Sequence, residues 1–184
     1  MTTIMTHAAV GLTLGYALGP ARRSGRYWLA CALLPVIPDA DVIGLPMGIA
    51  YGDLLGHRGL SHSLTFAIVL GLVTAFYVAR LEKREGREMR HLAVLFVVLI
   101  ASHGLMDMLT NGGLGIALFS PFITERFFWD WRPILVSPIG LKNFISPWGL
   151  AVVIQELRWF GAPAALLIAA TLIYRYMARR PSGK

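Results

Sequence analysis

The chain has 184 residues, enough for one domain, and it is 56% hydrophobic and only 15% charged. Its net charge is +7, and the charged residues lie between apolar segments. Membrane topology explains this distribution better than nucleic-acid binding does. Residues 60–79 contain no Asp, Glu, Lys or Arg over 20 positions, about the length that a helix needs to cross a bilayer. We therefore expect an integral membrane protein in which residues 1–184 form one all-α domain.

Five apolar segments follow one another along the chain, and we expect a polytopic helical bundle with four to five transmembrane segments. They cover roughly residues 4–18, 27–37, 60–79, 92–109 and 150–174. The first two are short for complete spans. Gly11, Gly15 and Gly19 recur every four residues on the first, a spacing typical of closely packed helices. The stretch 111–149 is rich in Gly, Pro and aromatic residues and should form an outer connection of loops and short interfacial helices.

The distribution of Lys and Arg predicts the orientation of these segments. With five crossings, residues 20–26, residues 80–91 and the C-terminus share one side, and they hold twelve of the 17 Lys and Arg residues. Positively charged loops stay cytoplasmic. The N-terminus, the 38–59 connection and the 111–149 stretch should therefore face the outer side of the cytoplasmic (inner) membrane.

Polar side chains from four separate segments converge at this predicted outer face. They are His7, Asp39, Asp41, His57, Arg58, His62, His103 and Asp107. His103 and Asp107 are four residues apart and share a helix face. In an extended turn after Pro38, Asp39 and Asp41 would point the same way. Gly56 and Gly59 place His57 on a loop, with Ser61 near the N-cap of the third helix.

Such a cluster at membrane depth needs a counter-charge, because isolated ionisable groups are costly there. Each residue alone also fits a structural role, but the combination predicts one or two divalent metal ions, with Zn²⁺ or Mn²⁺ preferred. The expected ligands are His7, Asp39, Asp41, His57, His62, His103 and Asp107. The metal would lower the pKa of a bound water and generate a hydroxide nucleophile.

Two of these residues are assigned to catalysis, Asp39 and Arg58. Arg58 would bind an anionic group such as phosphate. An aspartate that does not itself bind the metal would act as general base, and the residues leave open which aspartate this is.

The same residues carry a family resemblance. The chain contains in order "TH" (6–7), "PDAD" (38–41), "HRGLSHS" (57–63) and "SHGLMDMLTNGG" (102–113). This series resembles the YdjM-like family of bacterial and archaeal inner-membrane proteins, described as metal-dependent hydrolases. The resemblance covers about residues 3–121 and leaves the last segment as a variable tail. It implies a membrane hydrolase whose metal ligands are Asp39, Asp41, His57, His62, His103 and Asp107, with His7 added.

The predicted function is a membrane-embedded metal-dependent hydrolase that acts on a lipid or lipid-linked phosphoester, with no nucleic-acid partner. A looser similarity to zinc-dependent phospholipase C proteins favours the phosphoester. One alternative is a transporter of metal ions or protons, although a pathway should carry polar residues through the whole membrane depth. Another is a metal that only holds short helices together, without an open coordination position.

Overall fold

The computed structural model describes residues 1–179, with the backbone alone at Leu141, and it confirms the all-helical membrane bundle. The helices are α1 (Ile4–Leu18), α2 (Gly25–Leu33), α3 (Leu64–Glu82), α4 (Gly86–Asp107), α5 (Leu141–Phe144), α6 (Pro147–Glu156) and α7 (Ala162–Arg179). Two 3₁₀ turns, η1 (Ile37–Gly44) and η2 (Leu60–His62), precede α3, and a π-helical turn, η3 (Leu157–Gly161), joins α6 to α7.

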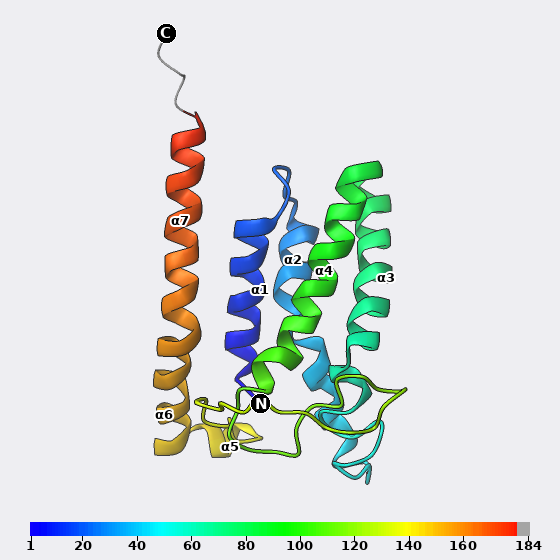
Figure 1. Ribbon diagram of the computed structural model, residues 1–184, viewed down its shortest axis with the longest axis vertical. Helices are drawn as coiled ribbons and strands as arrows, with labels where there is room; N and C mark the ends of the chain where they lie inside the picture. Colours follow the sequence, from blue (N-terminus) through cyan, green and yellow to red (C-terminus); the bar gives the residue numbers. More distant parts are fainter. Residues whose placement is uncertain (180–184) are drawn as a thin grey trace.

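Figure 1 shows α7, α1, α2, α4 and α3 running side by side along the long axis of the molecule. The α1–α2 turn, the α3–α4 turn and the C-terminal end of α7 lie at one end of the bundle. The N-terminus and the long connections 34–63 and 108–146 lie at the other end. The five segments therefore alternate in direction as predicted, and all the long connections share one end.

Within residues 1–179, three helices are long and apolar enough to cross a membrane: α3, α4 and the 33-residue unit Pro147–Arg179. The bent pair of α2 and η1, with an angle of 48° between its halves, makes a fourth candidate. At 15 residues, α1 is apolar but shorter than a full span. Large apolar side chains such as Val69 and Phe76 on α3, and Leu166 and Ile173 on α7, are exposed on the outside of the bundle. Such faces suit contact with lipid.

Several segment boundaries differ from the sequence prediction, and two of them lie next to the polar residues of the site. The second helix ends at Leu33 and not at residue 37, because Pro35 and Pro38 cannot continue it, and the chain bends into η1. The third helix begins at Leu64, and Ser63 is its N-cap, with the Ser63 side chain accepting a hydrogen bond from the Phe66 N–H. Ser61, which was predicted to lie near the N-cap, is in η2, two residues before it.

Small residues bring the helices together, as the glycine spacing predicted. Gly11 and Gly15 on α1, and Gly19 at its C-cap, lie so close to α2 that an added Cβ atom would overlap Cys31 or Tyr27. The Tyr27 hydroxyl donates a hydrogen bond of 2.7 Å to the Gly15 carbonyl. Gly71 on α3 allows a similarly close approach to Val97 on α4. These contacts fix the helices whose ends carry the polar residues.

Candidate metal centre

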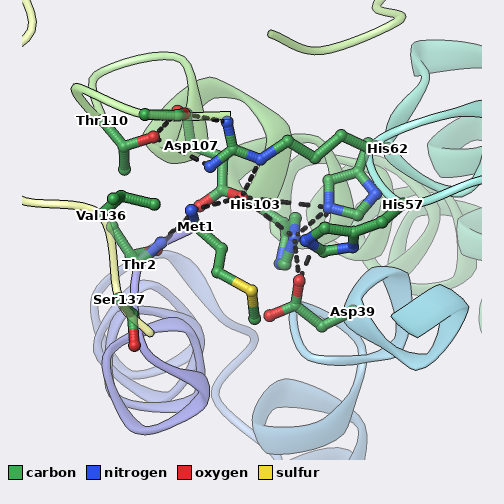
Figure 2. A network of polar contacts seen from close by, with 12 residues as sticks. Met1, Thr2, Asp39, His57, His62, His103, Asp107, Thr110, Val136 and Ser137 are labelled. Carbon is green, nitrogen blue, oxygen red and sulfur yellow. Dashed lines mark hydrogen bonds and ion pairs between the residues drawn. The ribbon is translucent and has the colours of Figure 1, made fainter. Parts of the chain in front are cut away.

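Two aspartates and two histidines meet at the end of the bundle that carries the long connections (Figure 2). Asp39 comes from η1, His62 from η2, and His103 and Asp107 from the last turns of α4. All four side chains are buried, and one ligand atom from each lies within 4.8 Å of the others. The predicted common face of His103 and Asp107 is thus present, and we call these four residues the Asp/His cluster.

The two imidazoles face each other through the same ring nitrogen. The Nε2 atoms of His62 and His103 are 2.9 Å apart. Oδ1 of Asp39 lies 3.4 Å from Nε2 of His103 and 3.6 Å from Nε2 of His62. Oδ2 of Asp107 lies 4.0 Å from both Nε2 atoms. Two nitrogens and two carboxylates are therefore directed toward one small volume.

Hydrogen bonds on the far side of each ring set which nitrogen carries the proton. Nδ1 of His103 is 2.7 Å from the Pro35 carbonyl, which only accepts, so this nitrogen is the donor. Nδ1 of His62 is 3.0 Å from the Ser61 hydroxyl, and this hydroxyl donates its own proton to Asp41, so Nδ1 of His62 also donates. In the neutral rings both Nε2 atoms then present lone pairs to the cluster. This outer hydrogen bonding is typical of histidines that bind metal ions.

The electrostatics of the cluster favour a bound positive charge. Burial by itself would lower the pKa of His62, but its contacts with the carboxylates of Asp39 and Asp41 raise that pKa above its ordinary value. Both oxygens of Asp39 and Oδ2 of Asp107 are buried without a hydrogen-bond partner among the described residues. Buried carboxylate oxygens that accept no hydrogen bond are costly. Two imidazole nitrogens and two carboxylates suit Zn²⁺, Mn²⁺ or Fe, so the residues present fit a divalent transition-metal ion.

Asp41 orients two histidines and does not join the Asp/His cluster. Its Oδ1 lies 2.6 Å from Nδ1 of His57. Its Oδ2 accepts hydrogen bonds from the Arg58 backbone N–H and the Ser61 hydroxyl, and it lies 3.1 Å from Nδ1 of His62. The prediction that Asp39 and Asp41 point the same way was wrong, because they lie in a 3₁₀ turn and not in an extended one. Three residues per turn separate side chains at i and i+2 by about 120°.

Asp41, His57 and His62 nevertheless form a second group whose ligand atoms lie within 4.8 Å of one another. His62 would have to serve this group through Nδ1, the nitrogen that already contacts Asp41. The geometry therefore favours one ion at the Asp/His cluster. A second ion remains a prediction.

His7 lies against the Asp/His cluster without belonging to it. Its ring stacks on that of His103 with 3.8 Å between the ring centroids. Its Nε2 is 2.6 Å from the Thr2 hydroxyl and 3.4 Å from Oδ1 of Asp107. The Thr2 backbone N–H also donates to this carboxylate oxygen, over 2.7 Å. The start of the chain thus holds one oxygen of Asp107 and leaves the other directed at the histidines.

Arg58 is fully buried beside Asp107. Its Nε is 3.5 Å from Oδ2 of Asp107, and its terminal nitrogens donate to the Gly112 carbonyl and the Thr110 hydroxyl over 2.7 and 2.9 Å. The residue has a φ of 66°, a conformation uncommon outside glycine. These contacts place Arg58 as a support for Asp107 and for the 110–113 turn. Binding of a substrate anion by Arg58 remains a prediction.

Glu156, at the end of α6, is a buried residue near the site that the sequence analysis did not select. Its carboxylate accepts hydrogen bonds from the Thr3 backbone N–H at 2.7 Å, from the Thr3 hydroxyl at 2.5 Å and from the Thr6 hydroxyl at 2.7 Å. Thr3 follows Thr2, which contacts Asp107. The C-terminal helical unit therefore anchors the N-terminal segment that supports the Asp/His cluster. The available signal was a carboxylate within a mostly apolar segment.

We expect Glu156→Gln to lower the midpoint of thermal unfolding by about 5 °C, because an amide cannot accept three hydrogen bonds as a carboxylate does. Thermal unfolding in detergent measures this change. The matched control is Glu125→Gln, which alters an exposed carboxylate and should shift the midpoint by less than ~1 °C. Equal midpoints for the two variants would contradict the anchoring role of Glu156.

Together, the fold and the buried donors define a polytopic helical membrane protein with a candidate metal centre at one end of its bundle. Residues 1–181 match the family described as "YdjM inner membrane protein", and the chain belongs to this family. The family resemblance predicted from the sequence is confirmed. The match also includes α6 and α7, so the view of the last segment as lying outside the resemblance was wrong.

The chain is also similar to "Inner membrane protein YbcI" of Escherichia coli (strain K12). The two are 40% identical over 168 residues, which cover 91% of this chain and 95% of the relative. No solved structure matches the chain. The family and the relative, together with the apolar helices, support a location in the inner membrane. Neither name describes an activity.

Proposed function

We propose that the protein is a metal-dependent hydrolase embedded in the membrane, acting on the phosphoester of a lipid or lipid-linked substrate. The observation that carries the proposal is the Asp/His cluster, with two Nε2 atoms 2.9 Å apart and three buried carboxylate oxygens without a hydrogen-bond partner among the described residues. Asp39, His62, His103 and Asp107 would hold the ion. A divalent ion held there would lower the pKa of a bound water and would polarise a phosphoryl oxygen.

Residues around the cluster would orient these groups and move a proton. Asp41 holds both His57 and His62 through Nδ1, so neither ring can rotate freely. His57, paired with Asp41 at 2.6 Å and adjacent to His62, is the residue that we assign to carry the proton. Thr2 and Arg58 would keep Asp107 in place. This arrangement separates the metal-binding aspartates from the aspartate that supports proton transfer.

The buried residues next to the cluster favour hydrolysis over ion transport. Along α4, the buried positions that lead away from His103 are all apolar: Ile100, Leu99, Phe96, Leu95 and Leu92. An ion pathway would need polar groups along this direction. A site confined to one end of the bundle suits chemistry on a headgroup at the membrane surface. The positive charges of residues 20–26 and 80–91 lie at the opposite end, which supports placing the site on the outer side.

The experiment that tests this function uses the protein in lipid nanodiscs, loaded with Zn²⁺ or Mn²⁺, and measures hydrolysis of bis(p-nitrophenyl) phosphate. We expect turnover that falls to background in Asp39→Ala and persists in His91→Ala. His91 is a matched control, because it contacts the Leu18 carbonyl at the other end of α4. His57→Gln should keep the metal and lose turnover. Absence of hydrolysis by the metal-loaded protein, together with metal flux in liposomes, would overturn the proposal in favour of transport.

A further inference from the structure

A cavity of about 390 Å³ lies next to the Asp/His cluster. It is bounded by the first turn of α1, by η1 and by the segment 137–144. Most of its wall is apolar, formed by Met1, Ile4, Met5, Val42, Ile139 and Phe144. The Ser137 N–H donates to the Met1 carbonyl over 2.9 Å, which holds the 137–144 segment over the start of the chain. The volume is within the range of about 300–1,000 Å³ typical of ligand pockets.

One charged side chain lines this cavity, that of Asp39. Asp39 is 4% exposed, and neither of its oxygens has a hydrogen-bond partner among the described residues. Asp39 therefore belongs to the Asp/His cluster and also borders the apolar cavity. A ligand that fills both regions needs a polar group that binds at the cluster and an apolar part that avoids the carboxylate.

The walls of the cavity suit a flexible hydrocarbon chain. Methionine and isoleucine side chains offer apolar contact without hydrogen-bonding demands, and methionine adapts its shape to the ligand. Ile4 and Met5 are 53% and 57% exposed, so the rim of the cavity reaches the outside of the bundle at the start of α1. The hydrocarbon chain of a lipid can enter there from the bilayer, while the lipid headgroup stays at the end of the bundle.

We propose that this cavity binds the hydrocarbon chain of an amphiphilic phosphoester whose phosphate lies at the Asp/His cluster. The position of the phosphate in this inference rests on the proposed function. The position of the hydrocarbon chain rests on the cavity. It adds a binding subsite, formed by α1, η1 and residues 137–144, that would select substrates by their apolar part.

The test compares p-nitrophenyl phosphodiesters that carry a methyl, butyl, hexyl or octyl group, with the metal-loaded protein in nanodiscs and esters below their micelle concentration. We expect kcat/KM to rise at least about tenfold from methyl to octyl, the effect of burying two or more methylenes. A geranyl ester compared with the octyl ester distinguishes isoprenoid from acyl-type chains, and either preference supports the subsite.

Ile139→Trp should fill the cavity and remove the gain in kcat/KM that accompanies a longer hydrocarbon group. The matched control is Ile123→Trp, since Ile123 is similarly exposed (46% against 43%) and does not line the cavity. Equal kcat/KM for the methyl and octyl esters in the unaltered protein would overturn the subsite while leaving the hydrolase proposal intact.

A second readout does not depend on turnover. An octylphosphonate with a terminal diazirine should crosslink to residues 137–144 or to the first turn of α1, and Ile139→Trp should abolish this crosslink. If no ester is hydrolysed, the proposed function fails, and the crosslinking then decides the subsite independently. Crosslinks confined to other segments, or crosslinks unchanged in Ile139→Trp, would overturn it.

Discussion

His103→Ala should weaken binding of a divalent ion by more than about 100-fold, because it removes one of only two imidazoles in the Asp/His cluster. Its Nε2 is 2.9 Å from that of His62 and 3.4 Å from Oδ1 of Asp39, so its removal leaves one imidazole and two carboxylates to hold an ion. Competition with a chromophoric chelator in detergent measures the affinity. The substitution should not unfold the last turns of α4, because backbone hydrogen bonds hold this helix.

Substitutions of two other histidines should weaken metal binding less than His103→Ala does. His57→Ala leaves the four donors in place but removes a partner of Asp41, so we expect an affinity loss of about tenfold, as for other residues that orient metal ligands. His91→Ala, at the opposite end of α4, should have no effect. If all three variants bound the ion equally well, or if His57→Ala lost it more completely than His103→Ala, the assignment of the ligands would be wrong.

Arg58→Ala should destabilise the protein by about 3–5 kcal/mol, because it leaves the buried carboxylate of Asp107 without its guanidinium partner. It also removes the hydrogen bonds to Gly112 and Thr110. Arg58→Lys keeps a positive charge but cannot bond to both groups, so we expect an intermediate loss. Thermal and denaturant unfolding in detergent measure these changes.

Arg132→Ala is the control for this substitution, since Arg132 is exposed and should change stability by less than ~0.5 kcal/mol. The experiment also separates two roles of Arg58. A variant that keeps its stability but binds phosphate more weakly would show that Arg58 is an anion-binding residue, as the sequence analysis predicted. A destabilised variant, as the contacts predict, assigns Arg58 to the support of Asp107.

The sequence was sufficient for the parts of the site that follow from helical periodicity. Residues spaced by four on an apolar helix share a face, so His103 and Asp107 were placed together correctly. Alternation of five segments then brought Asp39 and His62 to the same end of the bundle as His103 and Asp107. These inferences need only helix geometry and the length of a membrane span.

The irregular connections were less predictable. Whether residues 38–41 form an extended or a 3₁₀ turn decides which aspartate enters the cluster, and short proline-containing segments are compatible with both. The partnership of Glu156 with Thr3 joins positions 153 residues apart, and no local pattern encodes such a contact. The placement of His7 beside the cluster likewise depends on how α1 packs against α4.

The central claim is that the Asp/His cluster holds a metal ion, and elemental analysis of the detergent-purified protein tests it most directly. The protein and its His91→Ala variant should each contain about one transition-metal ion per chain after reconstitution with Zn²⁺ or Mn²⁺. Asp39→Ala and His103→Ala should contain none while remaining folded. Retention of the ion in both cluster variants, or its absence from the unaltered protein after reconstitution, would contradict the claim.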